Sequence, residues 1–304
     1  MSHFMKLRAF IDMEKIDWEC LSESPAPGAI KLLEANPEKI DWWSLSENPS
    51  PDAIKLLEAN PEKIYWSYMS ANPSAIHLLE ANHEKIYWTF LSLNTAPEAI
   101  KLLEANPDKI KWAYLSQNPS AIHLLEANQE KIDWAFLSLN TAPEAIKLLE
   151  ANQEKIDWQC LSGNTASESI KLLEANQDKI DWQCLSGNTA SEAIKLLEAN
   201  QDKIDWTKMS ANPAPGAIKL LEANPEKIMW FMLSANPGAI KLLEANQDKT
   251  YWVNLSGNPA IFEYDYKAMK DIMYNSGLFE GLMMNRFHPR NIPKFEEWGH
   301  EGIF

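Results

Sequence analysis

The sequence predicts an all-α fold, an α-solenoid of about eleven helix-turn-helix repeats with terminal caps. A phrase close to Ala-Ile-Lys-Leu-Leu-Glu-Ala-Asn-Pro-Glu-Lys-Ile-Asp-Trp recurs about eleven times, with its Trp every 22 or 24 residues. Each copy is too short to bury its own apolar face, so neighbouring copies must stack on one another. We expect the repeated tryptophans to be the main structural residues, and they are Trp18, Trp42, Trp66, Trp88, Trp112, Trp134, Trp158, Trp182, Trp206, Trp230 and Trp252.

The first helix of each repeat is predicted over Pro97 to Ala105 in a typical copy. Proline suits the first helical position, where its missing N–H would be unpaired anyway. The apolar residues of this segment share one face, whereas Lys101 and Glu104 lie opposite. Asn106 is expected to close this helix and to cap the next one.

The second helix is predicted to begin at Pro107 and to end at Ser116, with Ile110, Trp112 and Leu115 on its apolar face. Helices this short are unstable alone, so packing between repeats must hold them. Adjacent helices pack about 8–10 Å apart. Eleven repeats therefore predict a rod or an arc on the order of 100 Å long.

A leucine-rich-repeat-like solenoid is the alternative, because its period is also 20 to 29 residues. That fold needs an apolar residue at the position that follows the repeated serine. Here the position holds Glu, Gln, Gly or Ala in most copies, and strand-forming Val and Thr are scarce. The helical solenoid is the better prediction.

The degenerate ends predict three regions. Residues 1–28 read as an N-terminal cap and half-repeat, with Asp12 where other copies have Asn. Residues 29–262 hold the tandem two-helix repeats. Residues 263–304 read as a C-terminal helical cap and tail that would cover the apolar end of the last repeat.

The composition indicates a soluble intracellular protein of a reducing compartment. The formal net charge is −15, and most of this excess comes from Glu and Asp that recur in every repeat, which indicates either a solvated face or an acidic surface for a basic partner. Cys20, Cys160 and Cys184 share one repeat position, so they read as small apolar residues rather than as a disulfide framework. No leader is evident, and no run approaches the ~20 apolar residues that span a bilayer.

The combination of Leu-Ser-x-Asn-Pro with Lys-Ile-x-Trp resembles a tandem repeat family of giant DNA viruses. The ending Asn-Pro-Ala-Ile-Phe-Glu-Tyr-Asp-Tyr at 258–266, followed by His288-Pro-Arg, is similar to the way those proteins close. The resemblance covers nearly the whole chain. It implies a viral product in the cytoplasm of an infected host cell, and it implies no activity. The uniform copies fit either recent expansion or consensus engineering.

The sequence predicts no enzyme, no cofactor and no metal site. It has no Gly-rich phosphate loop, no G-x-S-x-G and no H-E-x-x-H. His77 and His123 lie two repeats apart and read as surface residues. Variable residues in each repeat are also typical of proteins that read one nucleic-acid base per repeat. Binding to phosphates needs a basic surface, however, and this chain is acidic, so no nucleic-acid partner is expected.

Functional residues are sought where the copies differ, because the identical positions carry the common fold. Three positions vary: the first and second residues after the repeated Trp, and the residue after the repeated Ser. On a helix they fall within about a third of the circumference, so they form a strip along the solenoid. At the second position, half-buried packing is the competing interpretation. The candidate partner-binding residues are Tyr68, Thr89, Phe90, Leu93, Ala113, Tyr114, Ala135, Phe136 and Leu139.

The sequence thus favours a non-catalytic scaffold that binds a host or viral protein along this strip, away from membranes. The alternative is a structural role, as a self-assembling or virion-associated repeat protein. The same apolar residues would then meet a second copy.

Overall fold

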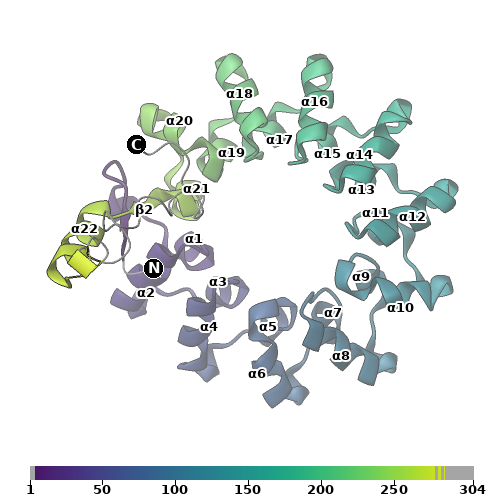
Figure 1. Ribbon diagram of the computed structural model, residues 1–304, viewed down its shortest axis with the longest axis horizontal. Helices are drawn as coiled ribbons and strands as arrows, with labels where there is room; N and C mark the ends of the chain where they lie inside the picture. The colour runs from purple at the N-terminus through teal and green to yellow at the C-terminus, as the bar shows by residue number, and fades with distance from the viewer. Residues whose placement is uncertain (1–3, 278–279, 282–283, 285–304) are drawn as a thin grey trace.

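The computed structural model, which describes residues 4–277, 280, 281 and 284, is an α-solenoid whose repeats close into a ring. In Figure 1 one layer of short helices borders the central opening, and a second layer lies outside it. The all-α solenoid predicted from the repeat is confirmed. The predicted rod or arc is wrong, because the first and last repeats meet.

Each inner helix begins at the repeated Trp. In six repeats the residue just before this Trp is Asp, and its carboxylate accepts a hydrogen bond from a backbone N–H in the first turn of the helix. Asp157 Oδ1, for example, accepts from Cys160 N–H (2.8 Å). The column of aspartates is therefore a column of helix caps. The inner helices are α1 (Trp18–Glu23), α3 (Trp42–Glu47), α5 (Trp66–Ala71), α7 (Trp88–Leu91), α9 (Trp112–Ser116), α11 (Trp134–Ser138), α13 (Trp158–Gly163), α15 (Trp182–Ser186), α17 (Trp206–Ala211), α19 (Trp230–Ser234) and α21 (Trp252–Ser256).

The outer helices carry the Ala-Ile-Lys-Leu-Leu-Glu phrase, and Pro stands in the first turn of several of them, as predicted. In the shorter repeats a 3-10 turn, such as Pro119–Ala121, precedes the helix. The outer helices are α2 (Pro27–Ala35), α4 (Pro51–Glu58), α6 (Ile76–Ala81), α8 (Pro97–Ala105), α10 (Ile122–Glu126), α12 (Pro143–Ala151), α14 (Ser167–Glu174), α16 (Ser191–Ala199), α18 (Pro215–Ala223) and α20 (Ile240–Ala245).

The second predicted helix is broken in two. Pro107–Lys109 forms a 3-10 turn, Ile110 is extended, and α9 starts only at Trp112. The extended Ile is buried in most repeats, which places one apolar side chain in the core before the chain turns to the inner layer. Asn106 closes α8 by donating from Nδ2 to the Leu102 carbonyl (2.8 Å), but its side chain does not cap the following turn.

The core is made mainly by leucines from both layers, such as Leu103 and Leu115, which are fully buried. The tryptophans are only half-buried and pack against this core from its margin. In eight repeats the Lys of the following repeat lies over the indole, as Lys131 Nζ does at 4.5 Å from the centroid of Trp112. Trp is thus a contact between repeats rather than the centre of the core.

Buried polar side chains also join the repeats. Ser116 Oγ donates to the Trp112 carbonyl (2.8 Å) and accepts from the backbone N–H of Asp133 in the next repeat (3.0 Å). Asn140 Nδ2 donates to the Ser116 carbonyl (2.9 Å). Since these side chains are inaccessible to water, each one must find its partners within the protein. This requirement explains why the Leu-Ser-x-Asn-Pro phrase changes so little from one repeat to the next.

The two ends of the chain share one repeat at the point of closure. Asp17 N–H donates to Ser256 Oγ (2.8 Å), and Lys15 lies over Trp252 (4.8 Å), which are the same contacts that join the other repeats. Strand β1 (Met5–Leu7) pairs antiparallel with β2 (Phe262–Tyr264). Eleven repeats that complete a turn rotate by about 33° each. The N-terminal half-repeat is therefore completed by the C-terminal Asn258–Ile261 segment.

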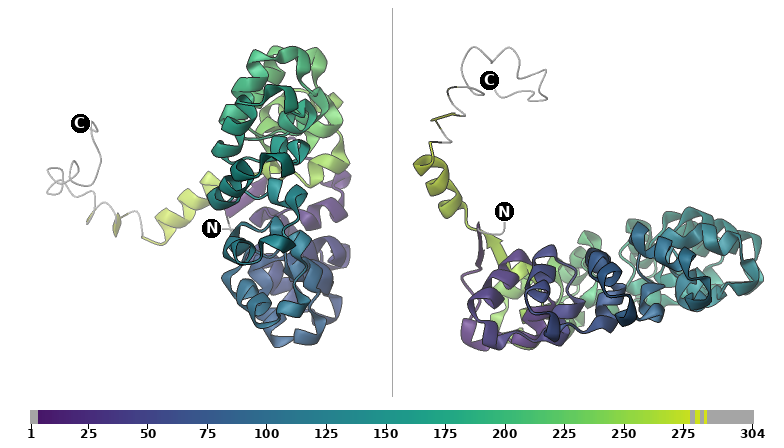
Figure 2. Two further views of the ribbon diagram at one scale, coloured as in Figure 1. Left: turned by 90° about the vertical axis from the view of Figure 1, so that its right-hand side faces the viewer. Right: turned by 90° about the horizontal axis from the view of Figure 1, so that it is seen from below.

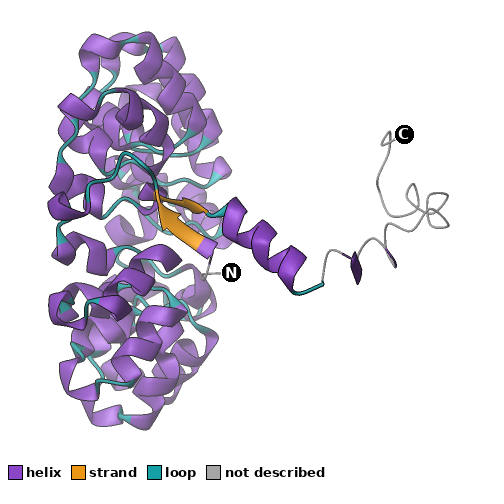
Figure 3. Cartoon of the chain, turned by 90° about the vertical axis from the view of Figure 1, so that its left-hand side faces the viewer, coloured by secondary structure: helices purple, strands orange, loops and turns teal. Residues whose placement is uncertain are grey.

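The C-terminal cap predicted over 263–304 differs from what the structure describes. The open side of α21 is covered by α1, not by the C-terminal helix. Helix α22 (Tyr266–Asn275) has no buried residue and leaves one face of the ring (Figure 2). The two strands lie at its base (Figure 3). Helix is described over Tyr266–Asn275 and again at residues 280, 281 and 284, and the tail of the predicted cap lies within residues 285–304, outside the described residues.

Candidate functional site

The inner helices present their exposed side toward the opening of the ring. In α5, Met69 and Ser70 are fully buried, whereas Ser67, Tyr68 and Ala71 keep access to solvent. The same alternation recurs along the inner layer, with Ser44 as the buried exception at the second position. The three repeat-variable positions thus form a surface on the inner helices, which we call the inner wall.

The large side chains of the inner wall gather on consecutive helices. The rings of Trp43 and Tyr68 meet edge to face at 5.1 Å between centroids. Tyr68 lies 6.2 Å from Phe90, and Tyr114 lies 5.5 Å from Phe136. Pairs at these separations are favourable beyond the area they bury. They also hold these partly exposed aromatic rings in defined orientations.

The structure places each residue predicted for the site on this wall. Tyr68, Thr89, Phe90, Ala113, Ala135 and Phe136 are half-buried, and Tyr114 is 38% exposed. Leu93 and Leu139, which follow the ends of α7 and α11, are half-buried as well. The aromatic rings are therefore compatible with both packing and partner binding, because part of each ring packs against a neighbouring repeat and part stays accessible.

Sequence reasoning missed a second apolar cluster near the point of closure. Met229, Phe231, Tyr251 and Val253 are about half exposed, and the rings of Phe231 and Tyr251 meet edge to face at 5.5 Å. Met229 and Tyr251 occupy the position before the repeated Trp, where most copies have the capping Asp. A change of chemistry at that position was the signal that could have found them.

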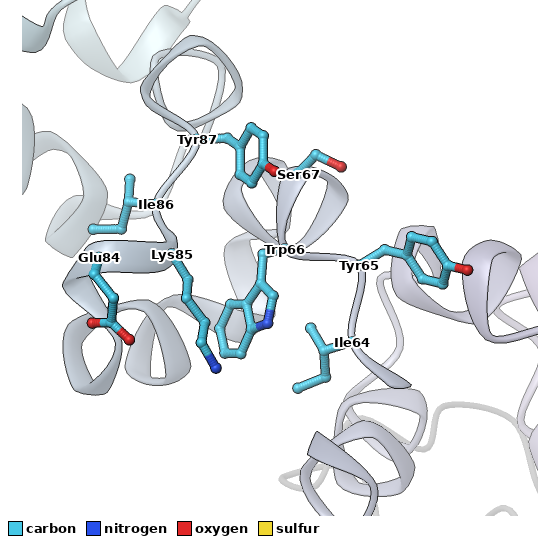
Figure 4. Close-up of a pocket in the computed structure, with 8 residues that line it drawn as sticks. All are labelled: Ile64, Tyr65, Trp66, Ser67, Glu84, Lys85, Ile86 and Tyr87. Carbon is cyan, nitrogen blue, oxygen red and sulfur yellow. The ribbon is translucent and has the colours of Figure 1, made fainter. Parts of the chain in front are cut away.

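Elsewhere in the ring, the residues just before the repeated Trp line a groove. Tyr65 and Tyr87, both about half exposed, line a groove of about 530 Å³ at the N-terminal end of α5 (Figure 4). Lys85 lies along Trp66 in this groove, with Nζ 4.6 Å from the ring centroid. The lining of the groove thus combines two partly exposed tyrosines with an ammonium that lies against the indole and the exposed carboxylate of Glu84.

A second pocket lies at the C-terminal end of α5. It measures about 320 Å³ and is lined by Glu47, Pro49, Tyr68, Ala71, Asn72 and Pro73. The Asn72 amide is already used: Nδ2 donates to the Asn48 carbonyl (3.0 Å) and Oδ1 accepts from Ser74 N–H (3.0 Å). Burial and the neighbouring Glu23 carboxylate raise the pKa of Glu47, while a hydrogen bond with Tyr68 opposes the shift. The pocket is thus largely apolar with one carboxylate.

Within the described residues, no three His, Cys, Asp or Glu side chains are placed to hold a metal ion. Burial, with Asp17 and Asp157 as neighbours, raises the pKa of Cys20 and of Cys160 to about 11. Thiols of such high pKa are poor nucleophiles at neutral pH. None of the helices in the described part of the chain is long and apolar enough to cross a bilayer.

By its fold, the protein belongs to the class of helical repeat proteins, with its repeats closed into a ring. Compared with protein-family models, with curated proteins and with solved structures, the chain has no match in any of the three. The function therefore has to be argued from the surface itself.

Proposed function

We propose that the protein is a non-catalytic scaffold that binds a segment of a partner protein on the inner wall of its ring. The observation that carries the proposal is the run of ordered, partly exposed aromatic side chains on consecutive inner helices, at positions that the repeat leaves free to vary. Aromatic residues in ordered, half-buried settings are favoured at the cores of interfaces.

The uneven distribution of these residues supports the proposal. If the second position after Trp served packing alone, any residue of suitable size would do throughout the ring. Instead the aromatics at this position lie on α5 to α11, while Cys160, Cys184 and Lys208 occupy the same position on α13, α15 and α17. The wall therefore has an aromatic sector and a sector without aromatic side chains at these positions, which suits a partner with a defined orientation.

The test is affinity capture from host-cell lysate with mass spectrometry. The bait is wild type beside a variant with Leu93→Ser, Leu139→Ser, Thr89→Lys and Ala135→Lys. The control variant, Ala105→Lys with Ala151→Lys, adds two charges to exposed ends of outer helices. We expect a protein that is retained by wild type and control and lost by the inner-wall variant. Equal retention by all three folded proteins would contradict the proposal.

A structural, self-associating role is the second candidate. Helix α22 favours it, because Tyr266 and Ile272 are 73% and 54% exposed on a helix that leaves the ring. Light scattering discriminates the two roles. A mass above that of one chain, restored to one chain by Ile272→Ser, would support self-association, whereas a single-chain mass at all concentrations would contradict it.

We also propose, on the strength of the sequence resemblance alone, that the chain is the product of a giant DNA virus and acts in the reducing cytoplasm of its host. Detection of the protein in the cytosolic fraction of infected cells tests this origin. Its recovery from uninfected cells of the same host would contradict it.

A further inference from the structure

We propose that the pocket between α3 and α5 receives a lysine or arginine side chain of the partner, so that the inner wall recognises a basic, apolar segment. The inference rests on the proposed function and adds the chemistry of the partner. It is carried by the lining of the pocket and by the charges beside it.

The lining selects an alkyl chain that ends in a cation. Pro49, Pro73 and Ala71 offer apolar contact, and the amide of Asn72 is committed to the backbone. The Glu47 carboxylate is then the charged group of the lining. A lysine or arginine side chain has the matching form, an apolar stem with a charged head that prefers a carboxylate or an aromatic face.

Aromatic rings stand where such a head would arrive. Trp43 and Glu47 are four residues apart on α3, so their side chains lie on the same side of the helix. Trp43, which is 41% exposed, meets the ring of Tyr68 at 5.1 Å, and Tyr68 itself lines the pocket. A cation beside this aromatic pair and one carboxylate is held by both kinds of attraction.

The charges of the inner wall are concentrated at this place. At its variable positions the acidic residues are Glu19, Glu23 and Glu47, on the neighbouring helices α1 and α3, and the basic one is Lys208 on α17, three inner helices away from α1. The repulsion between Glu23 and Glu47, which contributes to the raised pKa of Glu47, would be relieved by a bound cation. The aromatic sector thus adjoins an acidic one.

Fluorescence anisotropy with two labelled peptides tests the inference on the full chain. The first is Gly-Leu-Arg-Leu-Arg-Leu-Arg-Gly, and the second has citrulline, a neutral residue of the same shape, in place of each Arg. We expect wild type to bind the Arg peptide about tenfold more tightly than the citrulline peptide, and Glu47→Gln to remove this preference. Glu98→Gln, which removes the same charge from an outer helix, should retain it.

Trp43→Leu is a second variant, and its exposed position leaves the core intact. It should weaken binding of the Arg peptide severalfold. Equal loss in Glu47→Gln and Glu98→Gln would show general attraction to an acidic chain and overturn the inference, as would equal affinity for the two peptides. If the inner-wall variant still loses its lysate partner in that case, the proposed function stands with a partner of other chemistry. If no partner is lost, the proposed function itself falls.

Discussion

The asparagine of each Leu-Ser-x-Asn-Pro phrase is buried because its amide joins neighbouring repeats. Asn164 Nδ2 donates to the carbonyls of Ser138 (3.0 Å) and Asn140 (2.9 Å), and its Oδ1 accepts from Ala166 N–H (2.9 Å). At the point of closure Ser24 takes this place, and its buried hydroxyl finds no hydrogen-bond partner among the described residues. A serine is too short to reach the preceding repeat.

Ser24→Asn should therefore stabilise the closure. The longer amide would restore the donor that the other repeats have, and we expect the free energy of unfolding to rise by about 1 kcal/mol. The reverse change within the ring, Asn164→Ser, should lower it by about 1–3 kcal/mol because buried carbonyls lose their donors. Chemical denaturation measures both, and a destabilised Ser24→Asn would show that the site cannot hold an amide.

The cysteines give a prediction about pH. The thiolates of Cys20 and Cys160 are disfavoured by burial and by the nearby aspartates, so their pKa is about 11. At pH 8 we expect both to react with iodoacetamide on the order of a hundredfold more slowly than an ordinary thiol, with a rate that rises up to about pH 11. Modification at the rate of free cysteine would contradict the placement of these side chains.

At the scale of elements, the sequence predicted the outer helices well and the inner ones only in part. The outer helix has an apolar face at helical spacing, a proline in its first turn and a closing Asn. The inner segment has Ile and Trp two residues apart, a spacing that a continuous helix would not place on one face. That spacing indicates the extended residue seen at Ile110, and the capping Asp beside the Trp marks the true start of most inner helices.

Gly28 makes the contact between α2 and β2 possible. A Cβ atom at this position would lie 2.2 Å from the buried ring of Phe262, whereas at Gly163 it would meet nothing within 4 Å. Gly28→Ala should destabilise the protein by about 1–3 kcal/mol, since the ring of Phe262 has to shift. Thermal unfolding of Gly28→Ala beside Gly163→Ala tests this, and equal melting temperatures would show that the contact at the closure is loose.

At the scale of the whole molecule, the repeat predicts stacking but not curvature. A difference of a few degrees per repeat separates an open superhelix from a ring, and it depends on how side chains such as Leu103 and Leu115 pack across each interface. The two ends, which the sequence led us to interpret as caps, are instead the halves of one shared repeat: an N-terminal half-repeat without its first helix and a C-terminal Asn-Pro-Ala-Ile without its second. The chemistry of the inner wall could be predicted from the variable positions. That Glu19 and Glu23 on α1 lie on the helix next to Val253 on α21 could not, because the two helices are neighbours only when the ring closes.

The most direct test of the account is a distance measurement across the closure by pulsed electron-spin resonance, in a variant without the three native cysteines. One pair of spin labels replaces Met13 and Gln247, which occupy equivalent positions of the two repeats that meet. The matched pair replaces Gln177 and Gln201, the same position in adjacent repeats within the ring. A closed ring predicts coincident distance distributions for the two pairs. A distance for Met13 and Gln247 several times that of the matched pair would show an open solenoid and contradict the account.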